Sequence, residues 1–423
     1  MHGCLPPFYP NAFFGLIFML FNVIKWEMTD LVKVLLIFSF IVILLRKKLH
    51  IGLVMLIAAS LLFLLYRMPF SLVLATCKSA ALNQVTIKLV LALSFIRIFE
   101  LILREHAVLA DMMRTVKAVF RNRKIVTVSM PLLIGLIPSV GGAYFSAPMV
   151  AETTRDTRMS PEEKGFINYW FRHPWEYILP LYPGVLLASA ISGIKIQDLM
   201  AVNLPYAVLI VITGFIFAMH GIRGTMKAED RLSLKGLWSF VPIFTVLLLV
   251  MLFHIELHYA LIAVVLSLLL FYRYSLKATF AACKHGFSPD IIILILGVMF
   301  FKEAMENSGA VKNLSQFFIS EGIPVSPILF LLPFITGMLT GLTVGFVGST
   351  FPLIISITGH ASIGAISFAF TSGFLGVLLS PVHICLILTR EYFQADLWGI
   401  YKMMIPGSVV IFCAAVVEYL ILQ

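Results

Sequence analysis

An apolar stretch at residues 165–192 carries titratable side chains in its middle. His173 and Glu176 are three residues apart, with Pro174 between them, and proline interrupts a helix because it lacks the backbone N–H. A charge at the centre of a bilayer costs about 2.5–3.5 kcal/mol on insertion scales, so such groups usually face a cavity or one another. We therefore predict that His173 and Glu176 couple or gate the movement of an ion. The alternative is that they lie near the membrane interface and only anchor the helix.

A further titratable residue lies in the corresponding part of a later apolar run. Here His383 follows Ser380 and Pro381. Because the unperturbed pKa of histidine is about 6.5, the charge of the ring responds to small changes in its surroundings. We predict that His383 binds substrate or a proton and belongs with His173 and Glu176 to the coupling or gating residues. A hydrogen-bonded structural histidine is the alternative.

Two other stretches, 126–150 and 325–358, are apolar but interrupted by Gly and Pro. Glycine permits tight turns and close approach of the backbone. Non-helical backbone at membrane depth must line protein or a watery cavity, so we predict two re-entrant hairpins whose tips meet and bind substrate. Helix packing through small residues is the alternative. The candidate substrate-binding residues are Ser139, Gly141, Gly142, Ser146, Thr343, Gly345, Gly348, Ser349 and Thr350.

The composition of the whole chain favours a membrane environment for these stretches. Of 423 residues, 60% are hydrophobic and 12% are charged, and the mean hydropathy is +1.00. Soluble domains have about 25% charged residues, so a water-soluble globular protein is excluded, as is a disordered chain. Apolar runs of spanning length recur along the sequence. We predict an all-α polytopic protein of the cytoplasmic membrane, with about ten transmembrane helices and the two re-entrant hairpins.

The charges and cysteines indicate which partners to expect. The net charge of +10 comes from Lys and Arg in short loops, where such residues set topology and contact lipid headgroups, so we expect membrane lipid and no nucleic acid. The five cysteines are widely separated and form no CxxC motif. They therefore indicate neither a disulfide framework nor a structural zinc site. We predict no cofactor beyond a coupling ion, Na⁺ or H⁺, and the sequence assigns no metal.

The same series of elements occurs twice along the chain. Residues 28–223 and 224–423 each contain spans, a polar amphipathic segment, a glycine-rich hairpin, a proline-broken helix and a final helix. The basic loops agree with one positive-inside topology in which an odd number of spans separates the hairpins, so the halves have opposite orientation. Residues 1–27 are interpreted as an extension from an upstream start codon or as an extra first helix.

Two segments resemble a known family. LIGLIPSVGGAYFSAP (133–148) and FINYWFRHPWEYILPLYPG (166–184) are similar to those of the prokaryotic integral membrane family called domain of unknown function 401. The resemblance covers most of the chain from about Met28. That family is grouped with the ion transporter superfamily, alongside gluconate, dicarboxylate and divalent-anion/sodium symporters. The resemblance implies two inverted hairpin repeats, an elevator-type motion and a homodimer.

Inverted repeats with discontinuous helices are typical of secondary transporters. We predict a secondary active transporter that moves a small organic anion and is driven by Na⁺ or H⁺. A cation/proton antiporter or channel without an organic substrate is the alternative. An intramembrane enzyme is a more remote one, because the HxxE pair of His173 and Glu176 is not accompanied by a second metal-binding cluster in the sequence.

Overall fold

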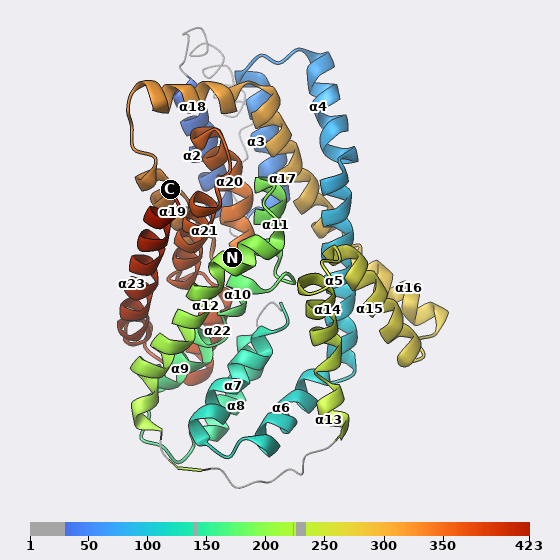
Figure 1. Cartoon of the computed structure of the whole chain (residues 1–423), viewed down its shortest axis with the longest axis vertical. Helices are drawn as coiled ribbons and strands as arrows, with labels where there is room; N and C mark the ends of the chain where they lie inside the picture. The colour runs from blue at the N-terminus through green and yellow to red at the C-terminus, as the bar shows by residue number, and fades with distance from the viewer. Residues whose placement is uncertain (1–29, 139–141, 223, 226–233) are drawn as a thin grey trace, which may run out of the picture.

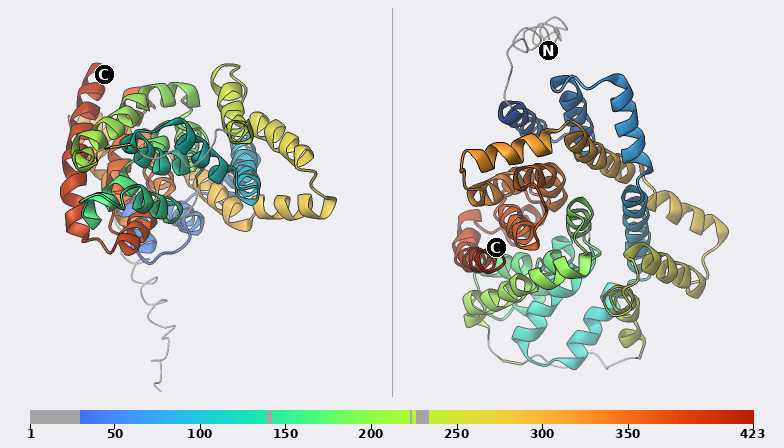
Figure 2. Two further views of the ribbon diagram at one scale, coloured as in Figure 1. Left: turned by 90° about the horizontal axis from the view of Figure 1, so that it is seen from below. Right: turned by 45° about the horizontal axis from the view of Figure 1, so that its top comes forward.

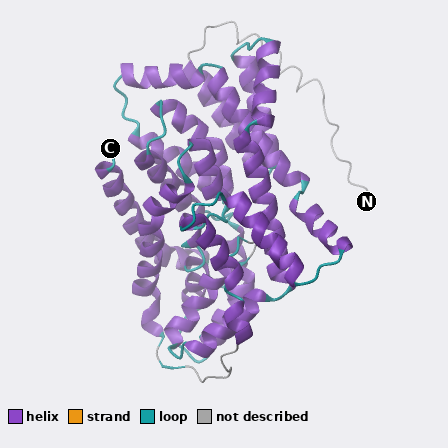
Figure 3. Ribbon diagram, turned by 45° about the vertical axis from the view of Figure 1, so that its right-hand side comes forward, coloured by secondary structure: helices purple, strands orange, loops and turns teal. Residues whose placement is uncertain are grey.

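The computed structural model describes residues 30–138, 142–222, 224–225 and 234–423. These residues are almost entirely helical, and the only β-type pairing among them is an isolated bridge between Asn122 and Thr225. Figure 3 shows this dominance of helices. The prediction of an all-α protein is therefore confirmed. Residues 1–27, interpreted as an extension or an extra helix, lie outside the described residues.

The first half of the described chain contains eleven α-helices and a short 3-10 helix. They are α2 (Asp30–Arg46), α3 (Ile51–Leu65), α4 (Phe70–Leu82), α5 (Gln84–Glu105), α6 (Val108–Val119), α7 (Arg123–Gly135), α8 (Ala143–Thr153), α9 (Pro161–Trp170), α10 (Trp175–Ile178), α11 (Pro183–Ser192), α12 (Ile196–Ala218) and η1 (Met219–Gly221).

The second half of the described chain, from residue 234, contains a similar series. Its helices are α13 (Leu234–Trp238), α14 (Val241–Met251), α15 (Leu257–Phe271), α16 (Leu276–Gly286), α17 (Pro289–Asn307), α18 (Ala310–Ser320), α19 (Ser326–Thr340), α20 (Thr343–Thr358), α21 (Ile363–Leu378), α22 (Ile384–Phe393) and α23 (Leu397–Ile421).

The order and the packing of the helices repeat between the halves. The first residues of α5 and α17 are 205 positions apart, and those of α12 and α23 are 201 apart. Partners are exchanged between the halves: α3 packs against α17 and α15 packs against α5, while α8 packs against α22 and α11 against α20. Each of these pairs joins a helix of the first half to a helix of the second half. In Figure 1, α7 and α8 lie in the lower half of the molecule, and α19 and α20 lie in the upper half.

Apolar helices are numerous, but their lengths differ. Among the described residues, α12 and α23 are long and apolar enough to cross a membrane, and seven other apolar helices have 10–17 residues. Large apolar side chains also lie on the outer surface, for example Leu270 and Phe271 on α15. Figure 2 shows α15 and α16 projecting from α5, away from the bundle that contains α9 and α21. These features are compatible with a membrane protein.

Capping residues and prolines determine where the helices around the centre begin and end. Ser160 forms a capping box with Glu163 at the start of α9, and the Ser362 hydroxyl accepts the N–H of Ala365 at the start of α21. Pro174 and Pro381 cannot donate a backbone hydrogen bond, and α9 and α21 end just before them. The chain then leaves the helix at residues 171–174 and 379–383. Together with the first residues that follow, we call residues 171–182 the first break and residues 379–385 the second break.

Candidate functional site

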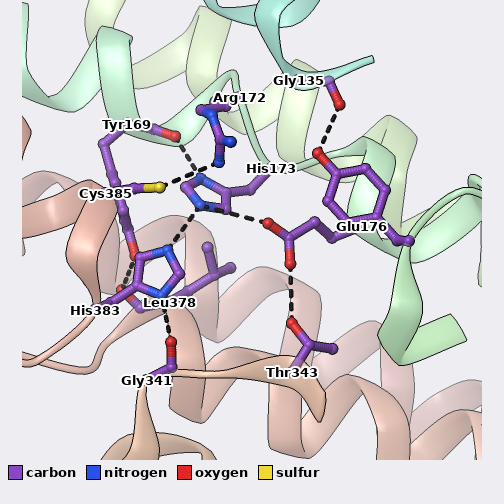
Figure 4. Close-up of polar contacts among 11 residues, drawn as sticks. Gly135, Tyr169, Arg172, His173, Glu176, Gly341, Thr343, Leu378, His383 and Cys385 are labelled. Atoms are coloured by element: carbon purple, nitrogen blue, oxygen red, sulfur yellow. Dashed lines mark hydrogen bonds and ion pairs between the residues drawn. The ribbon is translucent and has the colours of Figure 1, made fainter. Parts of the chain in front are cut away.

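The two breaks meet in the interior of the molecule, and each contributes a histidine. The Nε2 atoms of His173 and His383 are 3.2 Å apart, and both rings are buried. Figure 4 shows the rings facing one another with their Nδ1 atoms turned away. The structure thus places together two of the predicted coupling residues, which are 210 positions apart in the sequence.

Each imidazole is held by a backbone carbonyl group. His173 Nδ1 donates to the carbonyl oxygen of Tyr169, and His383 Nδ1 donates to that of Gly341, both at 2.6 Å. A carbonyl oxygen can only accept a hydrogen bond, so each Nδ1 carries the proton. In a neutral ring the lone pair is then on Nε2. When both rings are neutral, both Nε2 atoms therefore offer a lone pair to the same small space.

Glu176 connects the first break to the tip of the second hairpin. Its Oε2 accepts a hydrogen bond of 2.9 Å from the Thr343 hydroxyl, and its Oε1 lies 3.8 Å from His173 Nε2. The carboxylate is buried, with 6% of the residue exposed. A buried carboxylate is stable only when hydrogen bonds or positive charge compensate it. The third predicted coupling residue thus lies between His173 and the predicted substrate-binding residue Thr343.

Arg172 and Cys385 complete the cluster and had no assigned role in the sequence analysis. Arg172 Nη1 donates to Cys385 Sγ at 3.2 Å, and both residues are buried. The sequence does contain a signal for Cys385, because it lies two positions after His383 in an H-x-C triplet. We name the five residues His173, Glu176, Arg172, His383 and Cys385 the central cluster (Figure 4).

The first helix of each hairpin is attached to a break through carbonyl groups. In the first hairpin, the Tyr182 hydroxyl donates to the carbonyl oxygen of Gly135 at 2.6 Å. A Cβ at Gly135 would overlap the carbonyl oxygen of Arg172, so this close approach requires glycine. In the second hairpin, the Ser380 hydroxyl donates to the carbonyl oxygen of Met338 at 2.6 Å. Both hairpins therefore contact the breaks by backbone atoms.

The remaining candidate residues of the first hairpin lie away from the central cluster or outside the described residues. Ser139 and Gly141 are outside the described residues. Gly142 precedes α8, and its carbonyl oxygen accepts the N–H of Phe145 at 3.0 Å. Ser146 donates to Asn168 Oδ1 at 2.6 Å. Asn168 in turn donates to the Thr389 hydroxyl at 2.9 Å, so Ser146 belongs to a buried polar link between α8, α9 and α22.

In the second hairpin, only Thr343 of the candidate residues contacts the central cluster. Ser349 donates to the carbonyl oxygen of Gly345 at 2.6 Å, and Thr350 donates to that of Phe346 at 2.7 Å. Both hydroxyl groups therefore satisfy their donors within α20. A Cβ at Gly348 would lie 2.9 Å from Val298 Cγ2 on α17, so Gly348 occupies a tight helix contact. The sequence pattern predicted these helix-packing positions as substrate-binding residues together with Thr343, because it did not distinguish the body of the helix from the tip of the hairpin.

The comparisons with known proteins concern the chain as a whole. No curated protein matches the sequence. The profile of the family described as "Protein of unknown function (DUF401)" matches residues 30–422. Since this match covers nearly the whole length, the chain belongs to the DUF401 family.

Proposed function

We propose that this protein is a secondary active transporter of the cell membrane that moves a small organic anion, coupled to Na⁺ or H⁺. In this proposal the chain crosses the membrane about ten times, with two re-entrant hairpins in inverted repeats, and works by an elevator-type motion as a homodimer. The proposal also includes its place in the ion transporter superfamily. The observation that carries it is the meeting of two interrupted helices and a hairpin tip at one buried polar cluster.

The physical support comes from the cost of interrupting helices in a membrane. Backbone groups outside a helix cost several kcal/mol each in lipid unless protein or water pairs with them. Two such interruptions at matched places in two similar halves are typical of transporters whose binding site lies between the repeats. The packing exchanged between the halves, such as α3 with α17 and α15 with α5, fits this architecture.

The charges of the central cluster suit an anionic substrate with a coupling cation. Arg172 provides a buried positive charge at the first break, and α22 begins at the second break with His383 as its N-cap. A helix N-terminus presents N–H donors and a partial positive charge to anions. Glu176 supplies the negative charge that a coupling cation needs.

The alternative function is a cation/proton antiporter or channel that has no organic substrate. It is favoured by one observation, namely that a carboxylate, two imidazoles and a thiol outnumber the single guanidinium in the central cluster (Figure 4). The two functions differ in whether an organic acid binds. This difference can be measured without knowing the natural substrate.

The experiment is a thermal-shift screen of the purified protein against small organic acids, with and without Na⁺ and at two pH values. A ligand at 100 times its Kd stabilises the folded state by about 2.7 kcal/mol, so a specific acid raises Tm. The best acid is then tested for gradient-driven uptake into proteoliposomes. Cation flux without any stabilising organic acid would favour the alternative. The absence of both organic-acid uptake and cation flux would refute transport.

A further inference from the structure

Three potential metal ligands converge in the central cluster. The ligand atoms of His173, His383 and Cys385 all lie within 4.8 Å of one another, and all three residues are buried. His173 lies about 210 positions before the H-x-C triplet of His383 and Cys385, so no local motif contains all three residues. Nitrogen and sulfur ligands of this kind select borderline and soft transition metals over Na⁺, Mg²⁺ and Ca²⁺, which prefer oxygen.

The orientation of the two imidazoles needs an ion between them. Both Nδ1 atoms donate to carbonyl oxygens at 2.6 Å, which leaves two Nε2 lone pairs 3.2 Å apart. Two lone pairs at this distance repel each other unless a proton or a metal ion lies between them. The hydrogen bonds from Nδ1 to backbone carbonyls are also the usual outer-shell arrangement of metal-bound histidines.

The distances fit the coordination of zinc. Zn–N bonds of about 2.0–2.1 Å in a tetrahedron place two nitrogen ligands about 3.3 Å apart, close to the observed 3.2 Å. With a Zn–S bond of about 2.3 Å, the sulfur would lie about 3.6 Å from each nitrogen. Cys385 Sγ lies within 4.8 Å of the histidine ligand atoms, so these separations exceed the zinc-bound value by at most about 1.2 Å.

The neighbouring charges suit a thiolate–metal complex. Arg172 donates to Cys385 Sγ at 3.2 Å, and a cationic donor of this kind favours the thiolate, which is the form that binds metals. Glu176 Oε1, 3.8 Å from His173 Nε2, is placed to act as a fourth ligand or to hold a bound water.

We infer that His173, His383 and Cys385 form a binding site for one divalent transition-metal ion of the Zn²⁺ class. The inference does not rest on the proposed transport of an organic anion, because binding can be measured in purified protein without any uptake. The competing arrangement is a single proton shared by the two Nε2 atoms, which leaves no metal site.

The test uses the full-length protein, purified in detergent, stripped with a chelator and titrated with Co²⁺ as the spectroscopic substitute for Zn²⁺. We expect one Co²⁺ per chain, with visible absorption typical of tetrahedral coordination and a near-ultraviolet thiolate-to-cobalt band. Added Zn²⁺ should abolish both. Cys385→Ser should remove the near-ultraviolet band, and His383→Gln should weaken binding more than about 100-fold, since loss of outer-shell partners alone costs 10–100-fold.

Cys413→Ser is the matched control, because Cys413 is exposed on α23 and should not change the spectrum. Each variant is first compared with the wild type by its metal-free Tm, and Zn²⁺ should then raise the Tm of the wild type more than that of Cys385→Ser. The absence of stoichiometric Co²⁺ binding by the wild type would overturn the inference and favour the arrangement in which the two Nε2 atoms share a proton. A near-ultraviolet band that persists in Cys385→Ser would overturn it as well, because the metal would then be bound elsewhere.

Discussion

The first and second breaks are equivalent in position but unequal in chemistry. Each follows a helix that ends before a proline, and each directs a histidine Nε2 to the same point. The first break also carries the charged residues Arg172 and Glu176, whereas the second contributes Cys385. Similar backbone elements thus surround the cluster from two sides, while the side chains that the two breaks contribute differ.

The two histidines also differ in what holds them. The partner of His173 is a carbonyl in its own helix, four residues earlier. The partner of His383 is Gly341, at the turn of the second hairpin, where the backbone is left-handed with φ +62°. The orientation of His173 is therefore local, and that of His383 depends on the position of the hairpin. Movement of the second hairpin would release His383 but not His173.

The largest expected effect comes from removing the positive charge of the first break. Arg172→Gln should lower uptake of the proposed organic anion at least about 30-fold, because truncating one partner of a buried charged pair costs about 2–5 kcal/mol. Uptake into proteoliposomes measures this. Arg121→Gln, at an exposed cation outside the cluster, is the control. Equal uptake in both variants would remove Arg172 from the binding site.

The next effect concerns the packing of a hairpin on the first break. Gly135→Ala should lower the Tm in detergent, by an amount corresponding to about 1–3 kcal/mol, because the new Cβ would overlap the carbonyl oxygen of Arg172. A Cβ at Gly221 would meet Met159 Cγ at 3.4 Å, an ordinary van der Waals contact, so Gly221→Ala should be tolerated. An unchanged Tm for Gly135→Ala would show that α7 is not tightly attached to the break.

A smaller effect is expected at the start of α20, where a substitution at Thr343 is compared with one further along the same helix at Thr350. Thr343→Val removes the hydrogen bond to Glu176 and should lower uptake about 10-fold, since a hydrogen bond to a charged group contributes about 1.5–3 kcal/mol. Thr350→Val is the matched substitution in the same helix, and we expect less than about a 2-fold change because its hydroxyl bonds within α20. The reverse order would place the substrate beside Thr350.

The smallest expected effect is on hydrogen exchange, and it distinguishes His173, held by its own helix, from His383, held by the second hairpin. His383→Ala removes the hydrogen bond to Gly341, so backbone amides at residues 341–343 should exchange hydrogen faster. His173→Ala should change that peptide less, because its carbonyl partner lies in its own helix. Hydrogen exchange followed by mass spectrometry compares the two. The same acceleration in both variants would mean that the hairpin is held by the cluster as a whole.

Much of the frame was predictable because it depends on local rules. The predicted hairpin ranges 126–150 and 325–358 overlap α7–α8 and α19–α20, and the prolines at 174 and 381 mark the ends of α9 and α21. His173, Glu176 and His383 stood out because titratable groups are costly in apolar runs. Cys385 was not singled out despite its position two residues after His383, since a buried thiol packs like a small hydrophobic side chain whether or not it has a partner.

The sequence alone determined the helical class and the titratable residues of each break, because periodicity, proline and hydropathy act within a few residues. Only the tertiary structure decided that His173, His383 and Cys385 converge, since about 210 residues separate the breaks. It also decided that Thr343 faces Glu176 while Ser349 and Thr350 bond within their own helix. Which hydroxyl faces a partner depends on the packing of distant helices, and such contacts leave no local pattern in the chain.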